Sequence, residues 1–171
     1  CETAAKQYEG GQFAVIYLSP RDYHRVHSPA DCKLVEVRSC PGELFPVNSI
    51  SERHIPQYLA RNRRVAMVLE TANLGEVTLV MVAAMIVGRI TVTGIDERDV
   101  PLGNERLAVP QQLECGDELG IFHLGSTVVL FTEAGVPPIG RGNSPSVLGT
   151  AVAMGDLLTE TPNPAEDHLD D

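Results

Sequence analysis

Two histidines three residues apart, His24 and His27, are the first residues whose type and spacing suit chemistry. Ser19 followed by Pro20 is typical of a helix start, so we predict a helical turn that runs to about His27. On such a turn both imidazoles share one face, where one can act as general base and the other as general acid near neutral pH. The alternative is an exposed histidine beside a hydrogen-bonded core histidine.

The second candidate lies in the segment His123-Leu124-Gly125-Ser126-Thr127. It is not a G-x-S-x-G motif, so it does not predict the nucleophile of an α/β-hydrolase. A Gly-Ser pair before a β run is most often a turn, but glycine also permits an unusual backbone conformation at that peptide bond. In that geometry the Ser126 hydroxyl would attack the carbonyl carbon of Gly125.

The elements that must position these residues are predicted to be mainly β strands. Short apolar or alternating runs, separated by Gly, Pro and Asn, favour an antiparallel sandwich or barrel-like domain with one or two short helices. A second short helix is predicted over residues 55–62. We place the β domain at residues 1–135, and predict a largely disordered, Gly/Pro-rich and acidic tail at 136–171. The predicted strands cover residues 13–18, 34–38, 64–70, 76–87, 89–93 and 127–131.

Length and composition exclude several classes of protein. The 171 residues suit one domain, and a net charge of −10 without a basic patch argues against nucleic acid as a partner. The longest apolar run, residues 77–87, is shorter than the ~18 residues of a membrane-spanning helix. The four cysteines are irregularly spaced, so we expect reduced thiols. A zinc site that adds Cys32 and Cys40 to the two histidines has an unfamiliar spacing, and we predict no metal.

Several blocks of the sequence resemble the phosphatidylserine decarboxylase family. Residues 17–29, YLSPRDYHRVHSP, are similar to the histidine motif of that family, and residues 41–48, PGELFPVN, to its next block. Residues 60–65 and 86–88 fall where the family has similar segments. Residues 120–129, GIFHLGSTVV, resemble its self-processing site. The blocks occur in the same order, which is far more specific than Leu-Gly-Ser-Thr alone.

The resemblance implies a self-processing, pyruvoyl-dependent carboxy-lyase. Ser126 would attack Gly125, the chain would split between them, and Ser126 would become a covalent pyruvoyl group, the expected cofactor. His27 would be the base for this attack. The pyruvoyl group would form a Schiff base with phosphatidylserine and release carbon dioxide, and His24 would protonate the carbanion to give phosphatidylethanolamine.

The resemblance also implies partners and a location. We expect phosphatidylserine as substrate, a peripheral position on the cytoplasmic side of the inner membrane, and two chains that stay together after cleavage; the family allows a homodimer. An upstream Asp and the membrane-docking helices of the family have no counterpart here, so we expect the C-terminal portion of a longer protein. Two alternatives stay open. One is a non-catalytic β domain that binds lipid head groups or a protein partner, and the other is a Ser-His hydrolase whose chain stays intact.

Overall fold

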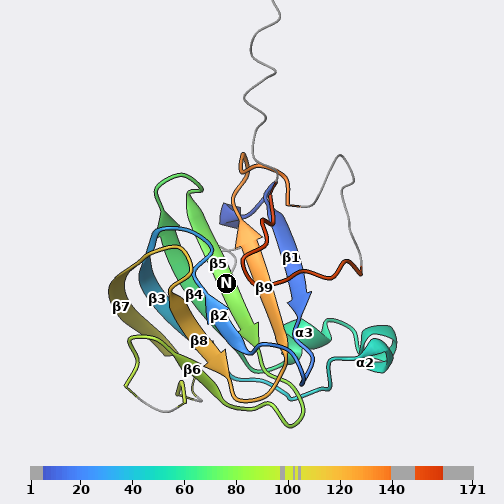
Figure 1. Cartoon of the computed structure of the whole chain (residues 1–171). Helices are drawn as coiled ribbons and strands as arrows, with labels where there is room; N and C mark the ends of the chain where they lie inside the picture. The colour runs from blue at the N-terminus through green and yellow to red at the C-terminus, as the bar shows by residue number, and fades with distance from the viewer. Residues whose placement is uncertain (1–5, 97–98, 102, 104, 140–148, 160–171) are drawn as a thin grey trace, which may run out of the picture.

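The structure, a computed structural model, describes residues 6–96, 99–101, 103, 105–139 and 149–159. It contains two antiparallel sheets, as predicted, and they do not close into a barrel (Figure 1). In order across the larger sheet, the strands are β1 (Gln12–Tyr17), β9 (Thr127–Thr132), β5 (Glu76–Val82), β4 (Arg64–Thr71), β3 (Cys32–Cys40) and β7 (Glu105–Leu113). In order across the smaller sheet, they are β2 (Arg25–His27), β8 (Glu118–Phe122) and β6 (Ile90–Val92).

The helix predicted after Ser19 is wrong. Ser19 and Asp22 close a single turn, in which Asp22 N donates to Ser19 O (2.9 Å) and Asp22 Oδ2 accepts from Ser19 N (2.7 Å). The chain then extends, because Phe122 N donates to His24 O (3.0 Å) and β2 pairs with β8. Cross-strand hydrogen bonds therefore satisfy the backbone that a helix would have used. As a result, His24 and His27 do not share a helix face.

The second predicted helix is confirmed in part. Residues 55–62 contain only the short helix α3 (Tyr58–Arg61), while α2 (Ser49–His54) precedes them. Asn48 caps α2, because its Oδ1 accepts from the backbone N–H groups of Ile50 and Ser51, each at 3.0 Å. Within the described residues, neither helix is long and apolar enough to cross a membrane.

The two sheets pack face to face around one hydrophobic core. Leu34 and Val37 of the larger sheet are fully buried, and Val26, Ile90 and Phe122 enter the same core from the smaller sheet. Burial of each such side chain contributes about 1.5–3 kcal/mol to folding. The alternating strands of the sequence therefore form a sandwich whose inner faces are its apolar faces.

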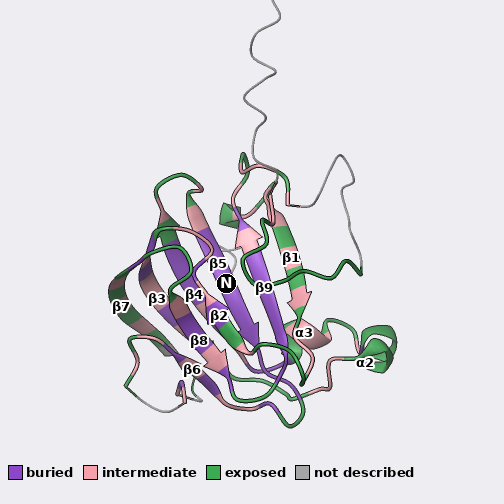
Figure 2. Ribbon diagram, in the orientation of Figure 1, coloured by how far each residue is buried: buried purple, intermediate pink, exposed green. Residues whose placement is uncertain are grey.

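Strands β5 and β9 are buried on both faces (Figure 2). On the face turned away from the smaller sheet, Val80, Val82 and Val129 form a second apolar cluster with Leu59 of α3 packed against it. Strand β1, at the edge of the sheet, is instead half-exposed and turns Phe13 toward solvent. The core is therefore thickest at β5 and β9, the two strands that border the predicted cleavage site.

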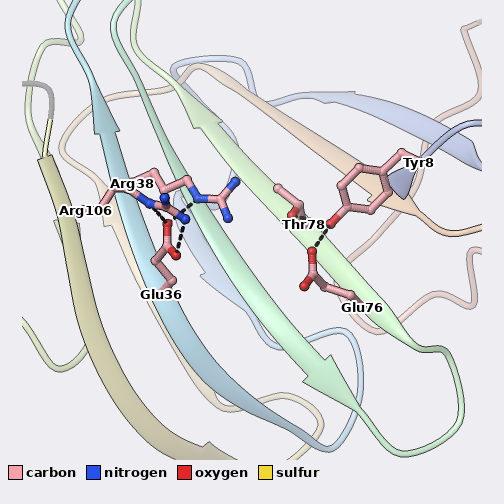
Figure 3. A network of polar contacts seen from close by, with 6 residues as sticks. All are labelled: Tyr8, Glu36, Arg38, Glu76, Thr78 and Arg106. Carbon is pink, nitrogen blue, oxygen red and sulfur yellow. Dashed lines mark hydrogen bonds and ion pairs between the residues drawn. The ribbon is translucent and has the colours of Figure 1, made fainter. Parts of the chain in front are cut away.

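Two polar clusters tie segments of the larger sheet together (Figure 3). Arg106 donates two hydrogen bonds to the Glu36 carboxylate (2.7 and 2.8 Å), and Arg38 also pairs with it. The Arg106 hydrogen bonds, with those of Arg38, lower the pKa of Glu36 from 4.5 to about 2. In the other cluster, Tyr8 Oη donates to Glu76 Oε1 (2.8 Å), and burial raises the pKa of the Tyr8 phenol.

The described cysteines, Cys32, Cys40 and Cys115, are free thiols, as expected. Residues 140–148 and 160–171 of the predicted tail lie outside the described residues. In the described part, Ile139 N donates to Gln12 Oε1 of β1 (2.8 Å), and Ile139 pairs with Thr159. The disorder predicted for the tail stays a prediction.

Candidate active site

Strand ends from both sheets meet at one end of the sandwich, the lower end in Figure 1. In the larger sheet, β1 and β5 end opposite the start of β9 at Thr127. In the smaller sheet, β8 ends at Phe122 opposite the start of β6. Residues 123–126 connect the two sheets here, and they contain both residues of the predicted cleavage site.

Ser126 is the last residue of this connection, directly before β9, and it is buried, with 1% of its surface exposed. Its Oγ donates a hydrogen bond to the carbonyl oxygen of Val82, the last residue of β5. Its own carbonyl oxygen accepts from Leu18 N at 2.7 Å. The hydroxyl is therefore removed from water and held beside two strand ends, and in this arrangement no imidazole contacts it among the described residues.

Gly125 is fixed by a close approach of backbone to backbone. A Cβ atom at this position would lie 2.4 Å from Leu18 O and 2.7 Å from Ser19 O. Only glycine fits without displacing the chain, because real Cβ atoms do not approach a backbone oxygen so closely. The space around the residue, rather than a positive φ, therefore explains the glycine before Ser126.

His24 lies against the same stretch of backbone as Gly125. Its Nε2 is 3.0 Å from Ser19 O, the carbonyl oxygen that also borders the Cα of Gly125. Because a carbonyl oxygen only accepts hydrogen bonds, Nε2 carries the proton in this contact. The structure thus brings His24, Gly125 and Ser126 together around the Leu18–Ser19 backbone.

His27 lies at the other end of β2, roughly 10 Å away from His24 by the rise of three strand residues. Its Nδ1 is 2.6 Å from Gly116 O, and its Nε2 is 2.8 Å from Tyr23 Oη. The Tyr23 ring stacks on the imidazole with centroids 5.6 Å apart. The structure does not bring His27 into contact with Ser126, and its role as base stays a prediction.

Two buried polar residues near the site were not identified from the sequence. Asn62 is fully buried and joins two loops, because its Nδ2 donates to Phe45 O (2.9 Å) and Ala83 O (3.0 Å). Arg63 donates to Gly88 O and pairs with Asp99 at 3.1 Å. These contacts link the end of β5 to the start of β6, and only the three-dimensional arrangement reveals them.

A second basic residue at this end, Arg89, precedes β6 and contacts His123. Arg89 Nη2 is 2.9 Å from His123 Nδ1, and His123 Nε2 is 2.7 Å from Thr91 Oγ1. Sequence reasoning gave neither Arg89 nor His123 a role. Arg89 directly follows the segment 86–88 and His123 lies near Gly125 in the sequence, but neither position indicates that the two side chains meet.

The arrangement has the parts needed for attack of a serine on its preceding peptide bond. The nucleophile is buried, the adjacent glycine is held by a close backbone contact, and one imidazole lies beside that contact. Among the described residues, no group of three or more His, Cys, Asp or Glu side chains could hold a metal ion. The position of the Ser126 hydroxyl next to Gly125 is compatible with acyl transfer at residues 125–126.

Comparison with known proteins finds a family model and several relatives that carry the same description. A family model described as phosphatidylserine decarboxylase matches residues 1–159. A phosphatidylserine decarboxylase proenzyme of Shewanella sp. (strain ANA-3) is 38% identical over 170 residues, which cover 94% of this chain and 57% of the relative. The proenzyme of Bordetella petrii is 41% identical over 161 residues, covering 90% of this chain and 54% of the relative. The proenzyme of Brevibacillus brevis is 40% identical over 137 residues, which cover 78% of this chain and 49% of the relative. The chain therefore spans about half the length of the curated relatives that it matches.

Proposed function

The chain belongs to the phosphatidylserine decarboxylase family, and from this we propose that it is a self-processing enzyme that converts phosphatidylserine to phosphatidylethanolamine. The relatives are named proenzymes, which supports a cleavage step in this chain. The observation that carries the proposal is the buried Ser126 hydroxyl next to a glycine that tolerates no side chain.

In the proposed cleavage, Ser126 Oγ rotates from Val82 O toward the Gly125 carbonyl carbon and forms a bond to it. The Gly125–Ser126 peptide bond breaks, the amine takes the serine proton, and an ester remains. Elimination then removes the Cα proton of residue 126 and breaks the Cβ–Oγ bond, leaving the Gly125 carboxylate and a dehydroalanine at the new chain start. Hydrolysis of the dehydroalanine yields ammonia and a pyruvoyl group at position 126.

The residues around position 126 fit a pyruvoyl group. Leu18 N already donates to the carbonyl oxygen of Ser126, and the same bond would hold the new chain end in place. A pyruvoyl group held there would supply an electron sink for the decarboxylation of a substrate that carries an amine. His24, beside Gly125, would deliver the proton that replaces the carboxylate.

In the proposal, His27 acts as the base of the cleavage step. Both of its ring nitrogens are engaged, by Gly116 O and Tyr23 Oη. To reach Ser126 it would have to break both contacts. Substitution of each histidine separately will assign the roles, because a cleavage defect and a decarboxylation defect are measured independently.

The substrate further implies a peripheral protein at a membrane surface, which we place on the cytoplasmic side of the inner membrane. Met85, Ile86 and Leu124 support this, because these apolar side chains are exposed at the same end as Ser126. Association of the two chains after cleavage is supported by the position of β9 between β1 and β5. A homodimer stays a prediction, which light scattering of the purified protein will test.

The test is the denatured intact mass of the purified protein, followed by an assay of carbon dioxide release from phosphatidylserine. We expect two chains, residues 1–125 and 126–171, with the second lighter by one ammonia than a chain that begins with serine. Ser126→Ala will stay whole. His24→Ala will lose carbon dioxide release, and His27→Ala will reveal whether cleavage depends on that imidazole.

Other outcomes identify the alternatives. A chain that stays whole and reacts at Ser126 with a phosphonylating reagent would be a Ser-His hydrolase. A chain that stays whole and does not react would favour a non-catalytic domain that binds lipid head groups or a protein. Either result would overturn the proposed decarboxylase.

A further inference from the structure

Arg89 and His123 contact each other at the end of the sandwich that holds Ser126, outside the residues that the proposed chemistry uses. They face each other across the ends of β6 and β8, where His123 N approaches Arg89 O at 3.4 Å. Arg89 Nη2 can only donate, so His123 Nδ1 accepts, and Nε2 carries the proton toward Thr91 Oγ1. His123 is thus neutral in this contact and orients the guanidinium without cancelling its charge.

The charge of Arg89 is not balanced by any described carboxylate. Arg38 pairs with Glu36 and Arg63 pairs with Asp99, whereas Arg89 forms no ion pair within the described part of the chain. In addition, its Nε is buried and has no hydrogen-bond partner there. A half-buried cation with an unsatisfied donor is unfavourable unless an anion completes it. The guanidinium therefore has the chemistry of an anion site.

Exposed apolar side chains lie near Arg89 and His123 in the chain. Met85 and Ile86 are 55% and 81% exposed in the turn that precedes Arg89, and Leu124, 38% exposed, follows His123. Ile86 has a φ of 74°, a left-handed conformation that is costly for a β-branched residue. Exposed apolar side chains near a cation that no described carboxylate pairs with match a ligand with an anionic head and an apolar body.

The proposed reaction indicates which anionic group of the substrate Arg89 would bind. Phosphatidylserine carries a phosphodiester and a carboxylate, and the carboxylate loses its charge as carbon dioxide leaves. A cation on the carboxylate would stabilise the substrate more than the transition state and slow the reaction. The phosphodiester keeps its charge throughout, so a cation there binds the substrate without opposing decarboxylation.

We propose that Arg89, oriented by His123, binds the phosphodiester of the phospholipid substrate, at the edge of the site nearest the membrane. This assignment rests on the proposed function. Arg89 is a substrate-binding residue in it, and His123 is a positioning residue. An arginine fork matches two phosphate oxygens, and lysine does not reproduce that geometry.

The kinetic test compares Arg89→Gln with Arg53→Gln, an exposed arginine of α2 that has no ion pair among the described residues. Both variants should be cleaved normally, as judged by intact mass. For Arg89→Gln we expect KM for phosphatidylserine in mixed micelles to rise about 10- to 100-fold, with kcat changed less than threefold. His123→Ala should raise KM in the same way, and His123→Asn, which keeps an acceptor near Nδ1, should restore part of the affinity. A cleaved, active Arg89→Gln with the KM of Arg53→Gln would overturn the proposal.

A second test does not depend on catalysis. In the uncleaved Ser126→Ala protein, the imidazole NMR signals of His123 are followed as three probes are added: glycerophosphoethanolamine, serine and inorganic phosphate. We expect glycerophosphoethanolamine to shift the signals, serine to leave them unchanged, and Arg89→Gln to abolish the shift. A response to serine alone would assign the cation to the carboxylate, and a response to inorganic phosphate alone would indicate a soluble anion; either would overturn the proposal. If the wild-type protein is neither cleaved nor active, the proposed function fails, and this titration still decides whether the phosphodiester site exists.

Discussion

Gly125→Ala should abolish rapid self-cleavage while leaving a folded protein. The methyl group would meet Leu18 O at 2.4 Å, whereas ordinary contacts begin at 3.4 Å. Either the 123–126 link or the Leu18–Ser19 backbone must therefore move by roughly 1 Å, because neither atom belongs to a flexible side chain. That movement also stretches the hydrogen bond from Leu18 N to Ser126 O, which holds the attacking residue in place.

The magnitude follows from the geometry of the reaction. A misplacement of about 1 Å between reacting groups slows a reaction by roughly 10²-fold. The overpacking itself should lower the free energy of unfolding by about 1–3 kcal/mol, which a domain of this size can tolerate. We therefore expect cleavage to slow about 100-fold in a chain that still unfolds cooperatively.

The assay is a time course of intact mass after refolding of the denatured precursor, with a urea melt of each variant. Gly88→Ala is the matched control, because a methyl group there meets only Leu44 Cδ1 at 3.8 Å. It should be cleaved at the wild-type rate. Gly125→Ala that is folded and cleaved as fast as the wild type would refute the argument that backbone packing holds the scissile bond.

Three further predictions concern stability. Arg63→Met should lower the free energy of unfolding in urea by about 2–3 kcal/mol, because it removes the cation that pairs with Asp99 and leaves the carbonyl groups of Gly88 and Val100 without the Arg63 donor; an unchanged midpoint would contradict this. The pKa of Glu36 is lowered to about 2, so the ionised carboxylate stabilises the folded state. Its contribution to the free energy of unfolding is complete above about pH 5 and is lost as the pH falls from 4.5 toward 2. In melts recorded as a function of pH, Glu36→Gln should reduce the loss of unfolding free energy between about pH 5 and pH 2 by about 1–2 kcal/mol. The same loss in the variant as in the wild type would contradict this. Ile86→Gly should raise the free energy of unfolding by about 1 kcal/mol and weaken binding to phosphatidylserine vesicles, whereas a lower unfolding midpoint would show that the turn is not strained.

The β architecture could be predicted because most of the strands are apolar runs or runs in which apolar and polar residues alternate. Strands β1, β3, β4 and β9 lie where apolar or alternating runs predict them. Strand β7 was missed because Pro110 interrupts it. The structure tolerates this proline because β7 is at the sheet edge, where its pairing with β3 shifts register between Leu34 and Glu36. Such a bulge depends on the partner strand and leaves no local signal.

The site was predictable only where the signal is local. Gly125-Ser126 is a contiguous pair, and the structure gives it a physical reason in the contact with Leu18 and Ser19. Ser19-Pro20 is typical of a helix start, but the hydrogen bond from Asp22 N to Ser19 O closes only a single turn. The chain after this turn is extended because β2 pairs with β8. The contact of Arg89 with His123 joins residues 34 positions apart, so no spacing rule could reveal it.

If the chain is cut before Ser126 as proposed, the position of β9 inside the sheet has a consequence for the lifetime of the protein. A single chain that unfolds can refold at a rate independent of its concentration, but the cut protein becomes a two-body complex. The shorter piece would contribute an interior strand with Val128 and Leu130 in the core, so it could leave only by breaking the pairing of β9 with both β1 and β5. Its loss would be slow, and recovery would require two separate molecules to meet. Cleavage would thus make unfolding effectively irreversible, because the separated pieces would not reassemble. The lifetime of the mature protein would then be set by its unfolding rate rather than by its equilibrium stability.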